Sequence, residues 1–305
     1  MGSSFSIKEA KSRSLILNRI TLGTVQFGLP YGIANQDGQV TFSVAKSMLQ
    51  LAATKGVDTI DTAIAYGESE TRLGDAGIQK FKVVTKLPQL PVNCKDIPLW
   101  IIEQVQASIE RLGMSCIYGL LLHQSDQLLS PSGKMIYQSL LNMKELGMVE
   151  KIGVSIYSPS ELDALVPEYR FDIVQAPFNL IDQRFCKSGW IKRLKEDNVE
   201  IHTRSAFLQG LLLMSQVAIP SKFNQWSELW AKWHKWLSSQ NISAVQACLA
   251  FPLSFPEIDQ VIVGADSLIQ LQQILEGASN AQLIDFPNLS SDDENLINPY
   301  RWSQL

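Results

Sequence analysis

The sequence has few residues of the types that build metal sites and disulfide frameworks. It contains four cysteines and three histidines among 305 residues. No two cysteines form a C-x-x-C pair and no histidine cluster accompanies them, so we predict no metal site. We expect reduced, partly buried thiols, as in cytoplasmic proteins. The four cysteines are Cys94, Cys116, Cys186 and Cys248.

Long hydrophobic runs and an excess of positive charge are also missing. No apolar stretch reaches the ~18 residues of a membrane-spanning helix. The N-terminal residues, which we expect to be disordered over 1–14, lack the apolar segment of a secretory signal. The formal net charge is −4, which provides no general attraction to nucleic acid or to a membrane surface. We therefore expect a cytoplasmic protein that binds neither.

Short apolar segments alternate with longer segments of helical period. Helix 97–112 is an example, with Ile101, Val105 and Ile109 on one face and with Asp96 and Gly113 as start and stop signals. Strands that are apolar throughout are typical of parallel sheets covered by helices. Eight strands are predicted, at 20–25, 57–61, 82–86, 117–122, 150–154, 172–175, 199–203 and 260–263. Eight strand–helix repeats predict an α/β fold, the (β/α)8 TIM barrel.

The alternative fold is a doubly wound sheet, but the chain has no G-x-G-x-x-G after its first strand and no phosphate-loop motif. We expect a single barrel domain over 1–305. A long loop with two helical stretches occupies 205–259, and 281–305 forms an irregular surface tail. Trp226, Trp230, Trp233 and Trp236 make one helical face, which we interpret as packing surface.

Polar residues follow most of the predicted strands, where a barrel enzyme carries its chemistry. Asp61, Lys86 and His123 end three neighbouring strands, and Tyr66 follows Asp61 in the stretch DTAIAYGESE. A lysine ammonium lowers the pKa of a nearby phenol, and a carboxylate keeps that lysine charged in a partly dry site. A neutral imidazole can orient a carbonyl. The group is thus a candidate general acid beside a polarised carbonyl, and no serine or cysteine nucleophile accompanies it.

Other interpretations of these four residues stay open at this point. Asp61 and Lys86 could form a structural ion pair, and His123 could be a core residue. Lys86 could instead form a Schiff base with a carbonyl substrate, as in a lyase.

These residues resemble the aldo-keto reductase family. The resemblance runs from LGTVQFG at 22–28 to VIVGADS at 261–267 and includes DTAIAYG, VVTKLP and LLLHQSD around the four residues. It implies reduction of an aldehyde or ketone with NADH or NADPH, with Tyr66 as proton donor. Asp61 and Lys86 would adjust the acidity of the Tyr66 hydroxyl, and His123 would orient the substrate. A small-molecule carbonyl is the implied partner. No feature of the sequence specifies an oligomeric state.

The resemblance also implies the residues that hold the dinucleotide. Ser155 and Gln175 would bind the nicotinamide carboxamide, and Arg204 would stack on the nicotinamide ring, where the family often has an aromatic residue. The segment TRSAFLQGLL would meet the pyrophosphate. The complete implied set is Gly23, Thr24, Ser155, Gln175, Arg204, Ser205, Phe207, Gln209, Gly210, Gly264, Asp266, Gln270 and Gln273.

The region after the last strand favours NADH slightly over NADPH. Residues 261–285 contain no Lys or Arg, and Asp266 lies where the family usually offers a cation to the adenosine 2′-phosphate. A carboxylate repels a phosphate but accepts from a ribose hydroxyl. Lys222, in the long loop, could reverse this preference.

The loops at 26–37, 89–96 and 206–225 and the tail with Trp302 are expected to wall the substrate pocket. Gln26, Tyr31 and Gln36 would fit a hydroxylated substrate, although ordinary loop polarity explains them as well. A second hypothesis for the whole chain is a redox-sensing module that binds the cofactor with negligible turnover.

Overall fold

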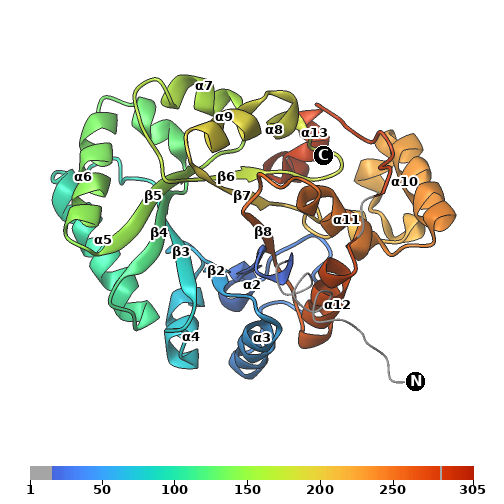
Figure 1. The fold of residues 1–305 in the computed structure, drawn as a ribbon, viewed down its shortest axis with the longest axis horizontal. Helices are drawn as coiled ribbons and strands as arrows, with labels where there is room; N and C mark the ends of the chain where they lie inside the picture. Colours follow the sequence, from blue (N-terminus) through green and yellow to red (C-terminus); the bar gives the residue numbers. More distant parts are fainter. Residues whose placement is uncertain (1–15, 282–283) are drawn as a thin grey trace, which may run out of the picture.

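Eight parallel strands close into a barrel in the order in which they occur along the chain, with β1 pairing both β2 and β8. The computed structural model describes residues 16–281 and 284–305, so the expectation for residues 1–14 lies outside the described part. The barrel confirms the predicted TIM fold, and each predicted strand is present (Figure 1). The strands are β1 (Ile20–Gly23), β2 (Thr59–Asp61), β3 (Lys82–Leu87), β4 (Ile117–Leu122), β5 (Val149–Ser155), β6 (Ile173–Pro177), β7 (Glu200–Arg204) and β8 (Gln260–Val263).

Helices surround the strands (Figure 1). The longer ones are α3 (Phe42–Lys55), α4 (Ser69–Ala76), α5 (Ile97–Leu112), α6 (Gly133–Glu145), α7 (Ser160–Leu165), α9 (Trp190–Glu196), α10 (Ser227–Gln240), α11 (Ala244–Leu253) and α12 (Leu268–Ser279). The short ones are α2 (Val25–Gly28), η1 (Ser125–Leu129), α8 (Arg184–Lys187), η2 (Leu211–Leu213), η3 (Gln216–Ala218), η4 (Ser221–Trp226), α13 (Glu294–Ile297) and η5 (Pro299–Gln304).

Helix α5 begins and ends where its sequence signals predict. The Asp96 carboxylate accepts from the Leu99 amide at 3.0 Å, which satisfies one of the free N–H groups of the first turn. Gly113 adopts a left-handed conformation with φ of 61° at the other end, where a side chain would be strained.

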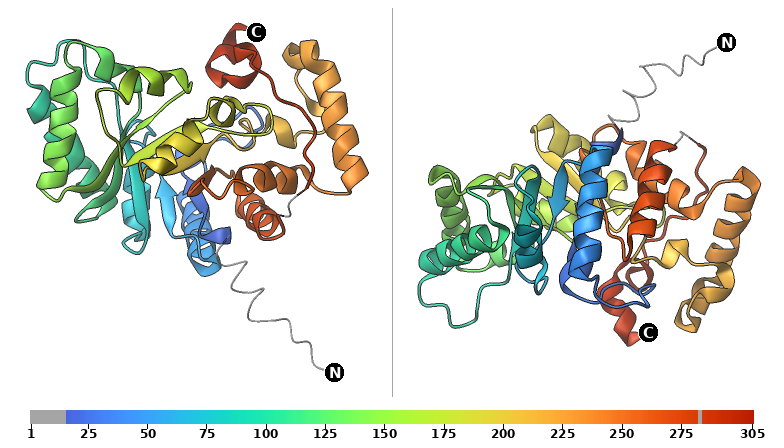
Figure 2. Two further views of the ribbon diagram at one scale, coloured as in Figure 1. Left: turned by 45° about the horizontal axis from the view of Figure 1, so that its top comes forward. Right: turned by 90° about the horizontal axis from the view of Figure 1, so that it is seen from below.

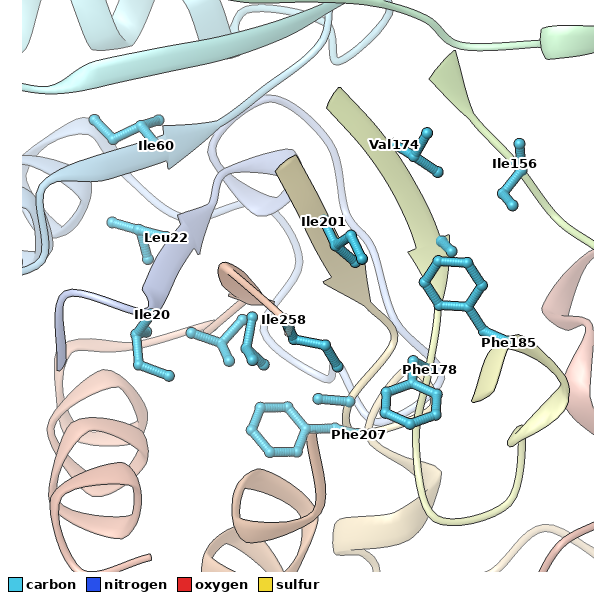
Figure 3. Packing of buried hydrophobic residues seen from close by; sticks show 14 of the residues in the cluster. Ile20, Leu22, Ile60, Ile156, Val174, Phe178, Phe185, Ile201, Phe207 and Ile258 are labelled. Carbon is cyan, nitrogen blue, oxygen red and sulfur yellow. The ribbon is translucent and has the colours of Figure 1, made fainter. Parts of the chain in front are cut away.

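Apolar side chains fill the space between the barrel and its helices. Ile20, Leu22, Ile60, Val174 and Ile201 belong to one continuous buried cluster (Figure 3). A separate small cluster consists of Val84, Leu121 and Ile173. Since alternate residues of a strand share a face, Val84 and Ile173 lie on the same faces as Lys86 and Gln175. The apolar cluster therefore underlies the polar residues at the carboxyl ends of these strands.

The segment between β7 and β8 contains η2, η3, η4, α10 and α11, and α10 lies at the outer edge of the molecule in all three views (Figures 1 and 2). The tryptophan stripe is packing surface, as predicted. Trp230 and Trp233 are buried, and their indole N–H groups donate to the carbonyls of Phe223 and Leu212. Trp236 donates to the Asp285 carbonyl. The stripe thus joins α10 to the preceding loop and to the C-terminal segment.

The C-terminal segment differs from the irregular tail that was expected. It contains α13 and η5, and Leu296 and Trp302 are buried. The Trp302 indole N–H donates to the Leu296 carbonyl, and its ring packs edge-on against Phe223 at 5.0 Å between centroids. The apolar side chains of this segment are spaced too irregularly to show a helical period. The sequence pattern therefore did not predict the helical turns that their burial stabilises.

A buried carboxylate joins α4 to β3 and α5 just behind the candidate site. Glu70 is 2% exposed, and one of its oxygens accepts from the hydroxyls of Thr85 and Ser108. The other oxygen accepts two hydrogen bonds from Arg111, at 2.9 and 2.7 Å. Because Thr85 precedes Lys86 on β3, this network fixes the strand that carries the lysine.

We expect Glu70→Ala to lower the free energy of unfolding by ~3–5 kcal/mol, since it leaves buried donors and a guanidinium without their acceptor. Urea denaturation measures the loss. Glu68→Ala is the matched control, because Glu68 is exposed and pairs with Arg72 on the surface. Equal losses in the two variants would contradict a stabilising role for the network.

Neither a spanning helix nor a metal-binding cluster occurs in residues 16–281 and 284–305. No helix there is long and apolar enough to cross a membrane, and no group of three or more His, Cys, Asp or Glu residues there could hold a metal ion. All four cysteines are free, with Cys248 buried and the others half-buried. Their burial agrees with the expectation of partly buried thiols.

Candidate active site

A buried ion pair lies at the carboxyl ends of β2 and β3. The Lys86 ammonium donates to Asp61 Oδ1 at 2.6 Å and to the Thr62 carbonyl at 2.9 Å. Lys86 is 1% and Asp61 4% exposed. A buried charge without a partner would be costly, so the pair depends on both members.

The Tyr66 loop is held by close packing against α2. Ser69 N donates to the Tyr66 carbonyl, while the Ser69 hydroxyl donates to the Thr24 carbonyl at 2.9 Å. A Cβ at Gly28 would lie 1.7 Å from the Tyr66 carbonyl oxygen, so only glycine fits there. Gly67 adopts a φ of 55°, which turns the chain directly after Tyr66. The chain therefore turns at the Tyr-Gly pair.

Tyr66, Lys86 and His123 meet at one place. The Lys86 Nζ atom lies 5.3 Å from the centroid of the Tyr66 ring. The Tyr66 and His123 rings pack edge to face, 5.8 Å apart and at 81°. The phenol, the imidazole and the ion pair therefore share one site, as the strand ends predict.

The direction of the Tyr66 pKa shift differs from the sequence-based expectation. Burial raises the pKa of Tyr66 well above its usual value, and the negative charge of Asp61 adds to this, while Arg204 opposes it. Loss of solvation and the nearby carboxylate therefore set the direction of the shift, whereas the sequence-based expectation was that the Lys86 ammonium would lower the pKa. The phenol is consequently protonated at neutral pH, the form that a proton donor needs.

The pKa values of His123 and Lys86 shift in the opposite direction. Burial, followed by the charges of Lys86 and Arg204, lowers the pKa of His123 to about 4. Its imidazole is therefore neutral at neutral pH, as expected. Burial also lowers the pKa of Lys86, and the Asp61 carboxylate opposes that shift.

One cavity of about 510 Å³ contains this site and extends to the ends of β7 and β8. Its volume is in the range of small-molecule sites. All the site residues expected from the sequence line it except Gly23 and Thr24. Thr24 is fully buried, and its hydroxyl donates to the Asp61 carbonyl at 3.0 Å. Its observed contacts are with the β2 strand end and with Ser69 rather than with the cavity.

The loop after β7 has an unusual backbone where it lines the cavity. Ser205 and Gln209, which line the cavity, have positive φ values of 64° and 52°, the buried Leu208 has 47°, and Gly210 follows at 90°. Non-glycine residues pay a conformational cost for such angles, and they cluster at functional sites. The Arg204 guanidinium lies 4.7 Å from the Tyr157 ring centroid and donates to the Ile156 carbonyl.

Several lining residues were not predicted from the sequence. Tyr157 follows β5, and its hydroxyl contacts that of Tyr300 at 3.0 Å. The position of Tyr157 just after a strand end is a signal that could have identified it, whereas Tyr300 reaches the cavity only because η5 packs there. Of the expected walls, loop 89–96 does not line the cavity, nor do Gln36 and Trp302.

The end of the cavity beside β8 is lined by hydrogen-bond acceptors. Asn35 donates to Asp266 Oδ1 at 3.1 Å, and Gln270 accepts from the Asp266 amide. Burial raises the pKa of Asp266, and hydrogen bonds from Gln26 and Asn35 oppose the shift. The buried Oε1 atom of Gln26 has no protein partner. Lys222 donates to the Trp302 carbonyl at 2.7 Å and does not line the cavity.

Comparison with known proteins gives consistent matches. A sequence model described as "Aldo/keto reductase family" matches residues 19–287. The chain is 24% identical over 262 residues to the "Uncharacterized oxidoreductase YqkF" of Bacillus subtilis, covering 79% of this chain and 84% of that protein. It is 26% identical over 213 residues to the "Aldo-keto reductase YhdN" of the same organism, covering 64% of this chain and 60% of that protein.

Solved structures share the fold. The aldo-keto reductase AKR11C1 from Bacillus halodurans, in its holo form, superimposes with a TM-score of 0.70 at 18% identity. The superposition covers 89% of each chain.

Proposed function

Because this chain belongs to the aldo/keto reductase family, we propose that it reduces an aldehyde or ketone with a nicotinamide dinucleotide and that Tyr66 is the proton donor. The observation that carries the proposal is the buried Asp61–Lys86 pair beneath a phenol and a neutral imidazole in one cavity. We further propose that the reaction takes place in the cytoplasm, where free thiols such as these persist.

The residues of the cavity suit the dinucleotide. Ser155 and Gln175 offer a hydroxyl and an amide at the barrel mouth, next to the pair. The strained loop at 205–210 and the acceptors at Gln26 and Asp266 lie along the same cavity. The bound dinucleotide would supply a hydride to the carbonyl carbon.

The chain's own groups then handle the proton. As negative charge grows on the carbonyl oxygen, the Tyr66 hydroxyl gives up its proton to that oxygen and an alcohol forms. The positive charge of Lys86, held in place by Asp61, stabilises the phenolate that remains. His123, neutral at working pH, donates an N–H hydrogen bond to the same oxygen and so orients the substrate.

For the cofactor we propose NADH in preference to NADPH. Among the described residues that line the cavity, the only cations are Lys86 and Arg204, both at the barrel mouth. At the other end lies the Asp266 carboxylate, and Lys222 is engaged with the Trp302 carbonyl. Acceptors pair with ribose hydroxyls, whereas a 2′-phosphate would meet a carboxylate of the same charge.

Titration with each dinucleotide tests this preference. We expect NADH to bind more tightly than NADPH, and Asp266→Arg to shift the ratio of the two Kd values toward NADPH by about tenfold or more, since 1.4 kcal/mol corresponds to a factor of ten. Quenching of tryptophan fluorescence measures both constants. Asp75→Arg is the matched control, because Asp75 is exposed on α4 and does not line the cavity. Tighter binding of NADPH by the unchanged protein would refute the preference.

The two alternatives make different predictions. A Schiff-base lyase needs an accessible, deprotonated lysine amine, but Lys86 is buried and donates to Asp61 and Thr62. Borohydride treatment with a carbonyl ligand should therefore leave the protein mass unchanged. A redox-sensing module would oxidise bound NADH once and then fail to turn over, so single-turnover and steady-state rates would differ widely.

A further inference from the structure

Gln175 contacts Asp61 from the opposite side of the barrel. Strands β2 and β6 are four positions apart in the closed barrel of eight, so their side chains meet across its interior. The Gln175 Nε2 atom donates to Asp61 Oδ2 at 2.8 Å, and Gln175 is 1% exposed. The sequence resemblance assigns Gln175 to the cofactor and gives no reason to expect this contact.

The two oxygens of Asp61 therefore have different partners. Oδ1 accepts from the Lys86 ammonium at 2.6 Å, and Oδ2 accepts from the Gln175 amide. A carboxylate held at both oxygens cannot rotate away from the lysine without breaking a buried hydrogen bond, which costs free energy.

The orientation of the Gln175 amide follows from its neighbours. Its Nε2 atom must face the carboxylate, because its oxygen would repel Asp61 there. The Oε1 atom then faces the Ser155 hydroxyl on the adjacent strand, at 3.5 Å. The amide thus links Ser155 to the ion pair beneath the phenol.

We propose that Gln175 is a positioning residue that holds Asp61 against Lys86, in addition to any contact with the cofactor. The proposal rests on the proposed function for its kinetic readout. The contact between Gln175 and Asp61 can also be tested by a measurement that does not depend on enzyme activity. The positioning role and the proposed function can therefore fail separately.

Two substitutions test the role through the pH profile of kcat at saturating cofactor. Gln175→Leu removes the donor, and we expect kcat to fall about 10- to 100-fold across the pH range. Gln175→Glu can replace the donor only while the introduced carboxyl is protonated. Its kcat should therefore approach the wild-type value at acidic pH and fall as pH rises, because two ionised carboxylates repel.

Gln273→Leu is the matched control, since it makes the same change of side chain in the same cavity but on α12 and not on the β6 strand that carries Gln175. We expect it to change the Kd of the dinucleotide and to leave the shape of the pH profile as in the wild type. If both Gln175 variants raised the Kd of the dinucleotide but kept the wild-type kcat and pH profile, Gln175 would serve only to hold the cofactor. That result would overturn the proposal.

A thermal-unfolding cycle gives the readout that needs no activity. We expect Gln175→Leu to lower the Tm by a few degrees in the wild type. In an Asp61→Ala background, where the amide has already lost its acceptor, it should cause no further fall. Equal falls in the two backgrounds would overturn the proposal even if the chain reduces no carbonyl compound. If the cycle shows coupling but no carbonyl is reduced, the proposed function fails and the contact stands.

Discussion

Replacing Tyr66 by phenylalanine is expected to reduce carbonyl turnover by ~10²- to 10⁴-fold, the range for loss of a positioned proton donor. The substitution removes one hydroxyl and leaves the ring that packs edge-on against His123 at 5.8 Å. The Kd of the dinucleotide should stay near the wild-type value, because the aromatic surface of the cavity is retained. Stopped-flow oxidation of NADH with an aldehyde measures the rate, and fluorescence titration measures the Kd.

Two further substitutions of tyrosine by phenylalanine serve as controls for that result. Tyr137 lies on α6, does not line the cavity and donates to the Arg170 carbonyl, so Tyr137→Phe should leave turnover unchanged. Tyr157 lines the cavity and contacts Tyr300, so Tyr157→Phe reports the effect of losing a cavity hydroxyl that donates no proton. If Tyr66→Phe reduces aldehydes at the wild-type rate, the assignment of the proton donor is wrong.

Lys86→Met is expected to remove turnover and also to destabilise the fold by ~3–5 kcal/mol, the cost of leaving a buried charge without its partner. Lys86 and Asp61 are both almost fully buried, so neither charge can be solvated when the other is lost. Urea denaturation measures the stability, and steady-state kinetics measure the turnover.

The double variant Asp61→Asn, Lys86→Met separates these two effects. Removing both charges leaves a neutral, well-packed pair of side chains, so much of the lost stability should return. Turnover should not return, because the cation that stabilises the phenolate is still missing. Recovery of turnover in the double variant would show that the ion pair serves folding alone.

Much of the fold was predictable because its signals are local. The eight strands are recognisable in the sequence as short apolar runs, the pattern of strands that are covered on both faces. The residues that start and stop helix 97–112 lie directly at its ends in the chain. Parallel strands in chain order then bring their carboxyl ends together, so Asp61, Lys86 and His123 could be expected at one end of a barrel.

Other features were predicted wrongly or missed because they depend on the surroundings of each side chain. The direction of the Tyr66 pKa shift depends on how far burial and the Asp61 charge outweigh the opposing charge of Arg204, and the sequence contains no measure of burial. The tail was expected to be irregular, yet η5 brings Tyr300 to the cavity. The apolar residues of the tail lack a helical period, so the sequence does not predict its helical turns. The packing of Trp302 against Phe223 is seen only in the structure.

The sequence by itself determined the barrel and the set of polar side chains at its mouth, since both follow from the period of the strands and from the residue that ends each one. Only the tertiary structure decided which of these side chains touch. The 2.8 Å contact between Gln175 and Asp61 joins residues 114 positions apart. Such a contact depends on closure of the barrel and on the rotamers that its packing allows, and no local pattern encodes either of them.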